Sequence, residues 1–119
     1  MSPAPAGDCL FCRVVRREVP AKVLFESAHV LAFEDIRPQA PVHILLVPKL
    51  HIASLNDAHE GSEALLGELL LAARRAAREK GVGESGYRIV LNTARDSGQA
   101  VFHIHFHVLG GRPLAWPPG

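Results

Sequence analysis

The chain has 119 residues, of which 48% are hydrophobic and 21% are charged. This length suits one domain with one core, and the composition argues against both a disordered chain and a membrane protein. Thirteen Lys and Arg residues against twelve Asp and Glu residues give a net charge of +1, which argues against a protein that coats nucleic acids by neutralising phosphates.

The N-terminal segment, residues 1–8, contains two prolines and lacks a basic start followed by an apolar stretch. It therefore predicts a flexible terminus rather than a signal peptide. Two cysteines in the whole sequence are too few for the disulfide framework of a small secreted protein. We expect a cytoplasmic protein in which residues 9–119 form a single domain.

The first elements of this domain are predicted to be a short helix and a hairpin. Residues 9–17 place Leu10 and Val14 on one side at helical spacing, and a proline follows the segment. Residues 22–25 and 29–33 are mostly apolar, with β-branched and aromatic members. Two such runs separated by a few residues are typical of a β-hairpin.

A rigid loop, a central strand and a long helix follow. Residues 37–41 contain two prolines and predict the loop, and the apolar residues 42–47 predict the strand. From residue 62 to residue 80 apolar side chains recur at intervals of three and four, with Ser62 as the candidate N-cap. The apolar stripe of this amphipathic helix consists of Leu66, Leu69, Leu70, Ala73, Ala76 and Ala77.

The C-terminal part predicts two more strands, residues 87–92 and 102–109, separated by a polar loop. The five predicted strands and two predicted helices do not alternate regularly along the chain. This order favours an α+β domain with a mostly antiparallel five-stranded sheet, one long helix and one short helix.

Three of the seven histidines occupy alternate positions, His103, His105 and His107. In an extended strand all three side chains would project to one face, about 7 Å apart. A neutral imidazole is a nucleophile, and neighbouring imidazoles can stabilise charge on a phosphorus centre. The alternative is a half-solvated strand whose polar positions happen to be histidine. We favour the chemical interpretation because strand surfaces prefer Thr or Val.

The segment HIHFHVL, residues 103–109, resembles the signature of the histidine triad (HIT) family. The similarity covers nearly the whole chain from Cys9 and continues through FEDI (33–36), PQAP (38–41), PKLH (48–51), GQ (98–99), GGR (110–112) and WPPG (116–119). The sequence is most similar to the histidine triad nucleotide-binding branch, which consists of purine nucleoside phosphoramidases. The resemblance implies an HIT-like fold and a homodimer in which the sheets of two subunits join.

The resemblance further implies a hydrolase that cleaves the P–N bond of adenosine-type purine nucleoside 5′-phosphoramidates. AMP and an amine would be released through a nucleotidyl-histidine intermediate, without a catalytic metal or an organic cofactor. His105 corresponds to the nucleophile, His107 to the residue on the nonbridging phosphate oxygens, and His43 to a supporting histidine. Asp35 corresponds to the carboxylate that holds the ribose.

Other positions that correspond to the nucleotide-binding site surround the purine, the ribose and the phosphate. They are Leu10, Phe11, Val14, Phe33, Ile36, Leu45, Asn92, Gly98 and Gln99. For each apolar position taken alone, packing in the core is the commoner role. The chain departs from the family pattern at Ala100, where this branch often has a serine that assists the leaving amine, and we therefore expect slower turnover.

Other functions remain open at this stage. A dinucleoside polyphosphate hydrolase of the same family would use the same triad, and a nucleotide-binding adaptor would need little turnover. A metalloenzyme that uses His105 and His107 as ligands lacks an obvious third ligand. We expect a purine nucleotide as the small-molecule partner and neither a membrane nor a nucleic-acid polymer.

The pair Cys9 and Cys12, taken alone, fits two small apolar residues on a helix face or a redox pair. Bacterial members of the wider family often carry this pair, and the resemblance implies a structural zinc site completed by His51 and His103. These four residues make a Cys₂His₂ set. His103 would then be a scaffold residue rather than a catalytic one. Reduced free thiols are the alternative.

Overall fold

The computed structural model describes residues 9–119; the segment 1–8, for which a flexible terminus is predicted, lies outside the described residues. The strands are β1 (Val23–Glu26), β2 (Val30–Glu34), β3 (Val42–Pro48), β4 (Tyr87–Val90) and β5 (Phe106–Gly110), and the α-helices are α1 (Leu10–Val15) and α2 (Glu63–Glu79). Among the described residues, three short 3₁₀ helices were not expected from the sequence: η2 (Leu55–Asp57), η3 (Glu60–Ser62) and η4 (Arg95–Ser97).

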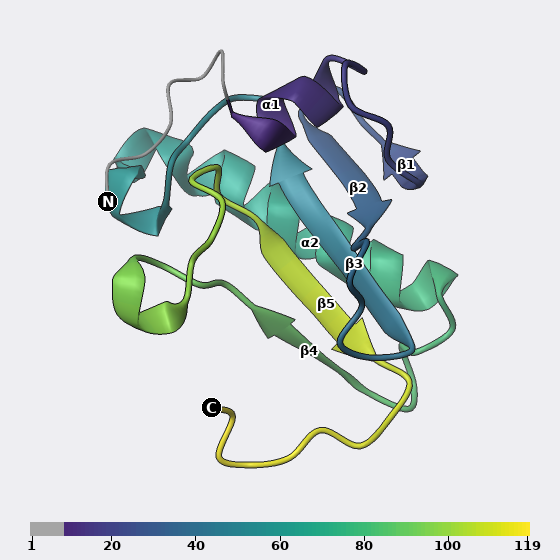
Figure 1. Ribbon diagram of the computed structural model, residues 1–119. Helices are drawn as coiled ribbons and strands as arrows, with labels where there is room; N and C mark the ends of the chain where they lie inside the picture. Colours follow the sequence, from purple (N-terminus) through teal and green to yellow (C-terminus); the bar gives the residue numbers. More distant parts are fainter. Residues whose placement is uncertain (1–8) are drawn as a thin grey trace.

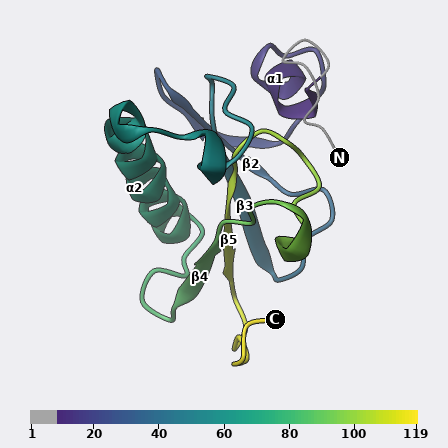
Figure 2. The ribbon, with the colours of Figure 1, turned by 90° about the vertical axis from the view of Figure 1, so that its left-hand side faces the viewer.

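The strands form one antiparallel sheet in the order β1-β2-β3-β5-β4 (Figure 1). Figure 2 shows α2 along one face of the sheet and α1 on the other side. The predicted α+β fold with five antiparallel strands, one long helix and one short helix is therefore confirmed. Within residues 9–119 no helix has the length and apolar character needed to cross a bilayer.

Apolar side chains form one cluster on each face of the sheet. The larger cluster joins α2 to the sheet, and the smaller one joins α1 to it. β3 contributes to both, and every one of its residues is buried. This explains why β3 reads as a nearly continuous apolar run rather than an alternating one, since a strand covered on both faces buries all its side chains.

The strand predicted over residues 102–109 is wrong at its start, because β5 begins only at Phe106. The antiparallel register pairs Leu46 with Phe106, so two more residues in the same register would bring Ile104 opposite Pro48. Proline has no N–H to donate to a ladder, and the Ile104 N–H instead donates to the carbonyl of Ile52 at 2.6 Å. His103 and His105 thus lie outside the regular strand. Their side chains still project to the same side of the sheet, where both rings meet the ring of Phe11.

Both predicted helices need corrections. Leu10 is 45% exposed and Leu70 is 46% exposed, so neither belongs to the buried face of its helix. Ser62 occupies the N-cap position of α2 without a side-chain capping bond. Its hydroxyl instead accepts a hydrogen bond from the His59 N–H at 3.3 Å, because the η3 turn directly precedes α2 and uses this hydroxyl.

Candidate active site

A cavity of about 430 Å³ opens between α1, the end of β2 and the histidine segment. Its volume lies in the range typical of small-molecule sites. Most of its lining is apolar: Leu10, Phe11, Val14, Val19, Pro20, Ala21, Phe33, Ile36, Leu45, Ala100 and Val101. The polar or charged lining residues are Glu34, Asp35, Arg37, His105 and His107. A largely apolar slot with a few polar groups suits a ligand that carries both a flat ring and an anionic group.

His105 presents a free lone pair to this cavity. Its Nδ1 lies 2.7 Å from the carbonyl oxygen of His103. A carbonyl can only accept, so Nδ1 carries the proton and donates, and the Nε2 atom of the neutral ring keeps its lone pair. The ring is buried and meets the Phe11 ring edge-on at 5.0 Å between centroids. Burial lowers the pKa of His105, which keeps the ring neutral and nucleophilic at pH 7.

His107 presents the opposite kind of group, a donor. The Gln39 N–H donates to Nδ1 of His43 at 3.0 Å, so neutral His43 carries its proton on Nε2. That Nε2–H lies 2.8 Å from Nδ1 of His107, which must accept, and the proton of His107 is therefore on Nε2. The Nε2 atom of His107 is buried and has no hydrogen-bond partner within residues 9–119.

Burial also explains the protonation state of this pair. It lowers the pKa of His107 to about 4, with His105 and His43 adding to the shift, and it lowers the pKa of His43. The ring centroids of His105 and His107 lie 5.0 Å apart, closer than the 7 Å expected for a regular strand, and His105 lies outside the regular strand. The arrangement places a lone pair and an unpartnered N–H side by side.

Asp35 lies beside the histidines at the edge of the cavity. One carboxylate oxygen accepts the N–H of Arg37 at 2.8 Å, and the other lies 3.4 Å from Nε2 of His43. Ile36 next to it is 89% exposed, far more than a core residue. A cavity-lining residue with so much free apolar surface fits a ligand contact better than a packing role.

The structure brings most of the proposed nucleotide-site residues to this cavity, but Asn92, Gly98 and Gln99 are outside its lining. Gln99 is buried, and its side-chain amide donates to the carbonyls of Ala53 and Val101 at 2.9 and 3.1 Å. Its amide oxygen accepts the Ala94 N–H at 2.9 Å. The Gln99 side chain therefore connects loops in this structure.

Sequence reasoning missed Arg37, which is the one cationic residue in the lining formed by the described part of the chain. The available signal was its position two residues after Asp35, since a site for an anionic phosphate calls for a cation nearby. The other lining residues that were missed, Val19, Pro20, Ala21, Glu34 and Val101, carry no comparable signal.

A second cluster consists of Cys9, Cys12, His51 and His103, whose ligand atoms all lie within 4.8 Å of one another. Nδ1 of His103 lies 3.3 Å from Sγ of Cys9 and 3.5 Å from Sγ of Cys12, and Nδ1 of His51 lies 3.3 Å from Sγ of Cys12. The Nε2–H of His103 donates to the carbonyl of Pro48 at 2.7 Å, which leaves its Nδ1 unprotonated and directed at the two sulfurs.

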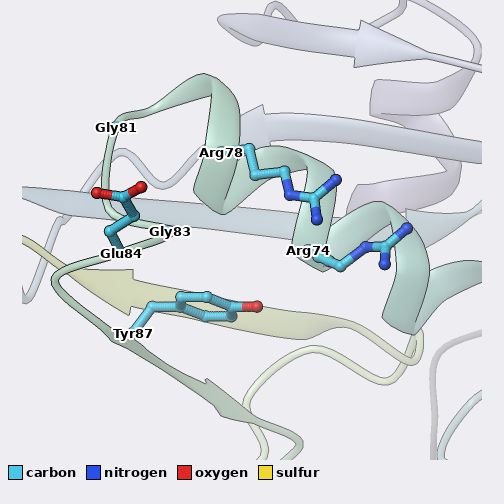
Figure 3. Close-up of a pocket in the computed structure, with 6 residues that line it drawn as sticks. All are labelled: Arg74, Arg78, Gly81, Gly83, Glu84 and Tyr87. Atoms are coloured by element: carbon cyan, nitrogen blue, oxygen red, sulfur yellow. The ribbon is translucent and has the colours of Figure 1, made fainter.

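A further cavity of about 580 Å³ lies between the C-terminal end of α2 and β4, away from the histidines. Figure 3 shows the guanidiniums of Arg74 and Arg78 projecting to one side and Glu84 at the other end of the cavity, with Tyr87 below. All its lining residues except Tyr87 are exposed. It is a shallow surface feature without a nucleophile.

Comparisons with known proteins agree with this geometry. A family model described as the HIT domain matches residues 16–114. An uncharacterized HIT-like protein of Synechocystis sp. is 48% identical over 114 residues, which cover 96% of this chain and 99% of that protein. A solved structure of an HIT family hydrolase from Legionella pneumophila has a TM-score of 0.92 at 50% identity, over 94% of this chain and 100% of that one. A histidine triad nucleotide-binding protein from Candida albicans has a TM-score of 0.80 at 30% identity, over 92% and 83%.

Proposed function

The chain belongs to the HIT family, and we propose that it is a nucleotide hydrolase that cleaves the P–N bond of adenosine-type purine nucleoside 5′-phosphoramidates. One observation carries this proposal: His105, whose Nε2 has a lone pair, and His107, whose buried Nε2–H has no partner among residues 9–119, line the same largely apolar cavity. The first group can attack an electrophilic phosphorus, and the second can donate to an oxygen on that phosphorus.

The proposed reaction has two displacements at phosphorus. In the first, Nε2 of His105 bonds to the α-phosphorus, the P–N bond breaks, and the amine leaves with a proton taken from water. In the second, water attacks the phosphorus of the nucleotidyl-histidine and loses a proton to the solvent, which replaces the proton taken in the first step; the bond to His105 breaks, its electron pair returns to Nε2, and AMP is released. The His107 N–H stabilises the negative charge that gathers on the phosphate oxygens in both steps.

The nucleotide part of the proposal rests on the rest of the lining. The apolar side chains of α1 and β2 offer a slot for a purine, and the Asp35 carboxylate can accept from the two hydroxyls of a ribose. Arg37 adds a positive charge to the lining of the same cavity, which favours an anionic ligand. The Candida albicans neighbour, described as a nucleotide-binding protein, supports a nucleotide as the ligand.

We also propose that Cys9, Cys12, His51 and His103 hold a structural Zn²⁺. Zn–S bonds of about 2.3 Å and Zn–N bonds of about 2.0–2.1 Å at a tetrahedral centre separate S from N by about 3.6 Å, close to the 3.3–3.5 Å observed. The hydrogen bond from His103 to the Pro48 carbonyl is the kind of support that ligating histidines have. When bound, the ion would cross-link α1 to the histidine segment, and it takes no part in the chemical steps.

A homodimer is the third part of the proposal. β4 is the last strand of the sheet, so its outer edge has backbone groups free to pair with another strand. Leu70 and Leu71 on α2 are 46% and 59% exposed, which adds apolar surface for a subunit contact.

The test is to incubate the protein with an adenosine 5′-phosphoramidate and to follow the release of amine and AMP. Rapid release that His105→Ala abolishes and that exposed His29→Ala leaves intact would support the proposal. Tight AMP binding without turnover would favour an adaptor and overturn the enzymatic part. Faster cleavage of a dinucleoside polyphosphate than of the phosphoramidate would assign the chain to a different hydrolase activity.

A further inference from the structure

We propose that Arg112 is a positioning residue for the imidazole pair His43 and His107, acting through the loop of residues 35–41. The inference rests on the proposed function, because the pair belongs to the same site. Arg112 lies outside the lining of the cavity, and its effect would reach the chemistry through the orientation and the protonated nitrogen of the two rings.

The link between Arg112 and the pair is a single residue of the loop. Nη2 of Arg112 donates to the carbonyl of Gln39 at 2.9 Å, although the two residues are 73 positions apart in sequence. The N–H of Gln39 donates to Nδ1 of His43 at 3.0 Å. Gln39 is exposed, so hydrogen bonds rather than apolar packing keep its backbone in place. Arg112 therefore fixes the carbonyl of Gln39, and the N–H of the same residue determines which nitrogen of His43 carries the proton.

The packing of Gly111 brings Arg112 to the loop. β3 and β5 pair Val42 with Gly110, which places the following residues next to the end of the loop. Gly111 has a φ of +91°, and a Cβ atom there would lie only 2.8 Å from Cβ of Pro41. Only glycine tolerates both this conformation and this close approach. The backbone at Gly111 therefore lies directly against the loop, and the next side chain reaches the Gln39 carbonyl.

The protonated nitrogen of His43 determines what the cavity presents to a phosphate. With the Gln39 N–H in place, His43 donates from Nε2, and His107 must carry its own proton on Nε2, a buried and unpartnered atom of a residue that lines the cavity. Without that donor, His43 can carry the proton on Nδ1 and accept on Nε2. His107 would then donate from Nδ1 and have a lone pair instead of a proton on Nε2, and this lone pair would repel a phosphate oxygen that approaches it.

A second group favours the same arrangement. A carboxylate oxygen of Asp35 lies 3.4 Å from Nε2 of His43, and a carboxylate attracts an N–H. Loss of Arg112 should therefore shift the tautomer equilibrium in part rather than reverse it. Because a single neutral hydrogen bond is involved, the expected loss in kcat is about threefold to tenfold.

The experiment compares Arg112→Ala and Arg112→Lys with Arg88→Ala. Arg88 is the matched control, since its Nη2 donates to the Ala115 carbonyl at 2.9 Å and so binds the same C-terminal segment without touching the loop. The readouts are kcat and KM for the phosphoramidate and the imidazole ¹⁵N chemical shifts of His43 and His107, which report the protonated nitrogen.

We expect Arg112→Ala to lower kcat by about threefold to tenfold with little change in KM and to move the ¹⁵N shifts of both rings. Arg112→Lys should recover part of both effects, and Arg88→Ala should match the wild type. A fall in kcat with unchanged ¹⁵N shifts, or equal behaviour of Arg112→Ala and Arg88→Ala, would overturn the inference. If the wild type has no hydrolase activity, the proposed function fails, but the ¹⁵N shifts still test the role of Arg112.

Discussion

His103 and His105 are joined by a 2.7 Å hydrogen bond from Nδ1 of His105 to the backbone carbonyl of His103. The side chain of His103 meanwhile lies among Cys9, Cys12 and His51. One residue thus connects the two clusters: its imidazole belongs to the cysteine site, and its carbonyl orients the proposed nucleophile. The stability of the first site should therefore affect the geometry of the second.

Removal of the proposed zinc should weaken the fold. Purified protein should contain about one zinc per chain, and Cys12→Ser should lower the free energy of unfolding by at least about 2 kcal/mol, because a structural metal contributes directly to folding. Elemental analysis and thermal unfolding measure the two effects. A chelator should destabilise the wild type and leave Cys12→Ser unaffected. Zinc-free protein together with unchanged stability of Cys9→Ser would contradict the zinc site.

His107→Ala should lower kcat for the phosphoramidate by about 10² to 10³, the usual loss when one donor to a developing oxyanion is removed. KM should change less, since the N–H acts mainly on charge that grows in the transition state. Steady-state kinetics with His29→Ala as the control measures the effect. A kcat within threefold of the wild type would mean that this N–H, although buried and without a partner among residues 9–119, does not act on the substrate.

The free energy of unfolding should fall in mild acid. The pKa of His107 is about 4 in the folded protein, against an ordinary value of 6.5. The unfolded chain therefore binds more protons between these two values, so that stability decreases as the pH falls from about 6.5 toward 4, by at most about 3 kcal/mol for this residue. Denaturant unfolding at several pH values should show the slope, and His107→Gln should reduce it. An unchanged slope in that variant would contradict the assignment.

The sheet and the histidine cluster could be predicted because both depend on how residue types are spaced along the sequence. β3 is a continuous apolar run because α1 and α2 cover its two sides. The alternation of His105 and His107 persists although only His107 lies in a regular strand. Spacing alone could therefore place the imidazoles on one side of the sheet.

The contacts that orient these rings could not be predicted. The bond from the Gln39 N–H to His43 comes from the backbone of an irregular loop, and the bond from Arg112 to the Gln39 carbonyl spans 73 positions. Neither has a periodic signal. Apart from proline, every residue has the same backbone N–H and C=O groups, so the fold rather than the residue type determines which partners these groups find. The early end of the pairing between β3 and β5 is different. It could have been predicted from Pro48, because proline has no N–H to donate to a neighbouring strand.

Ala100 provides the most direct test of how the leaving amine departs. It lines the cavity with His105, and the absence of a hydroxyl there should cost about 1 to 3 kcal/mol of transition-state hydrogen bonding. Ala100→Ser should therefore raise the rate of phosphoramidate cleavage. The gain should be larger for a strongly basic alkylamine leaving group than for a weakly basic arylamine, because the more basic amine depends more on receiving a proton as the P–N bond breaks. Pre-steady-state release of each amine measures the effect, and equal rates in the two proteins for both amines would contradict a role for a hydroxyl at this position.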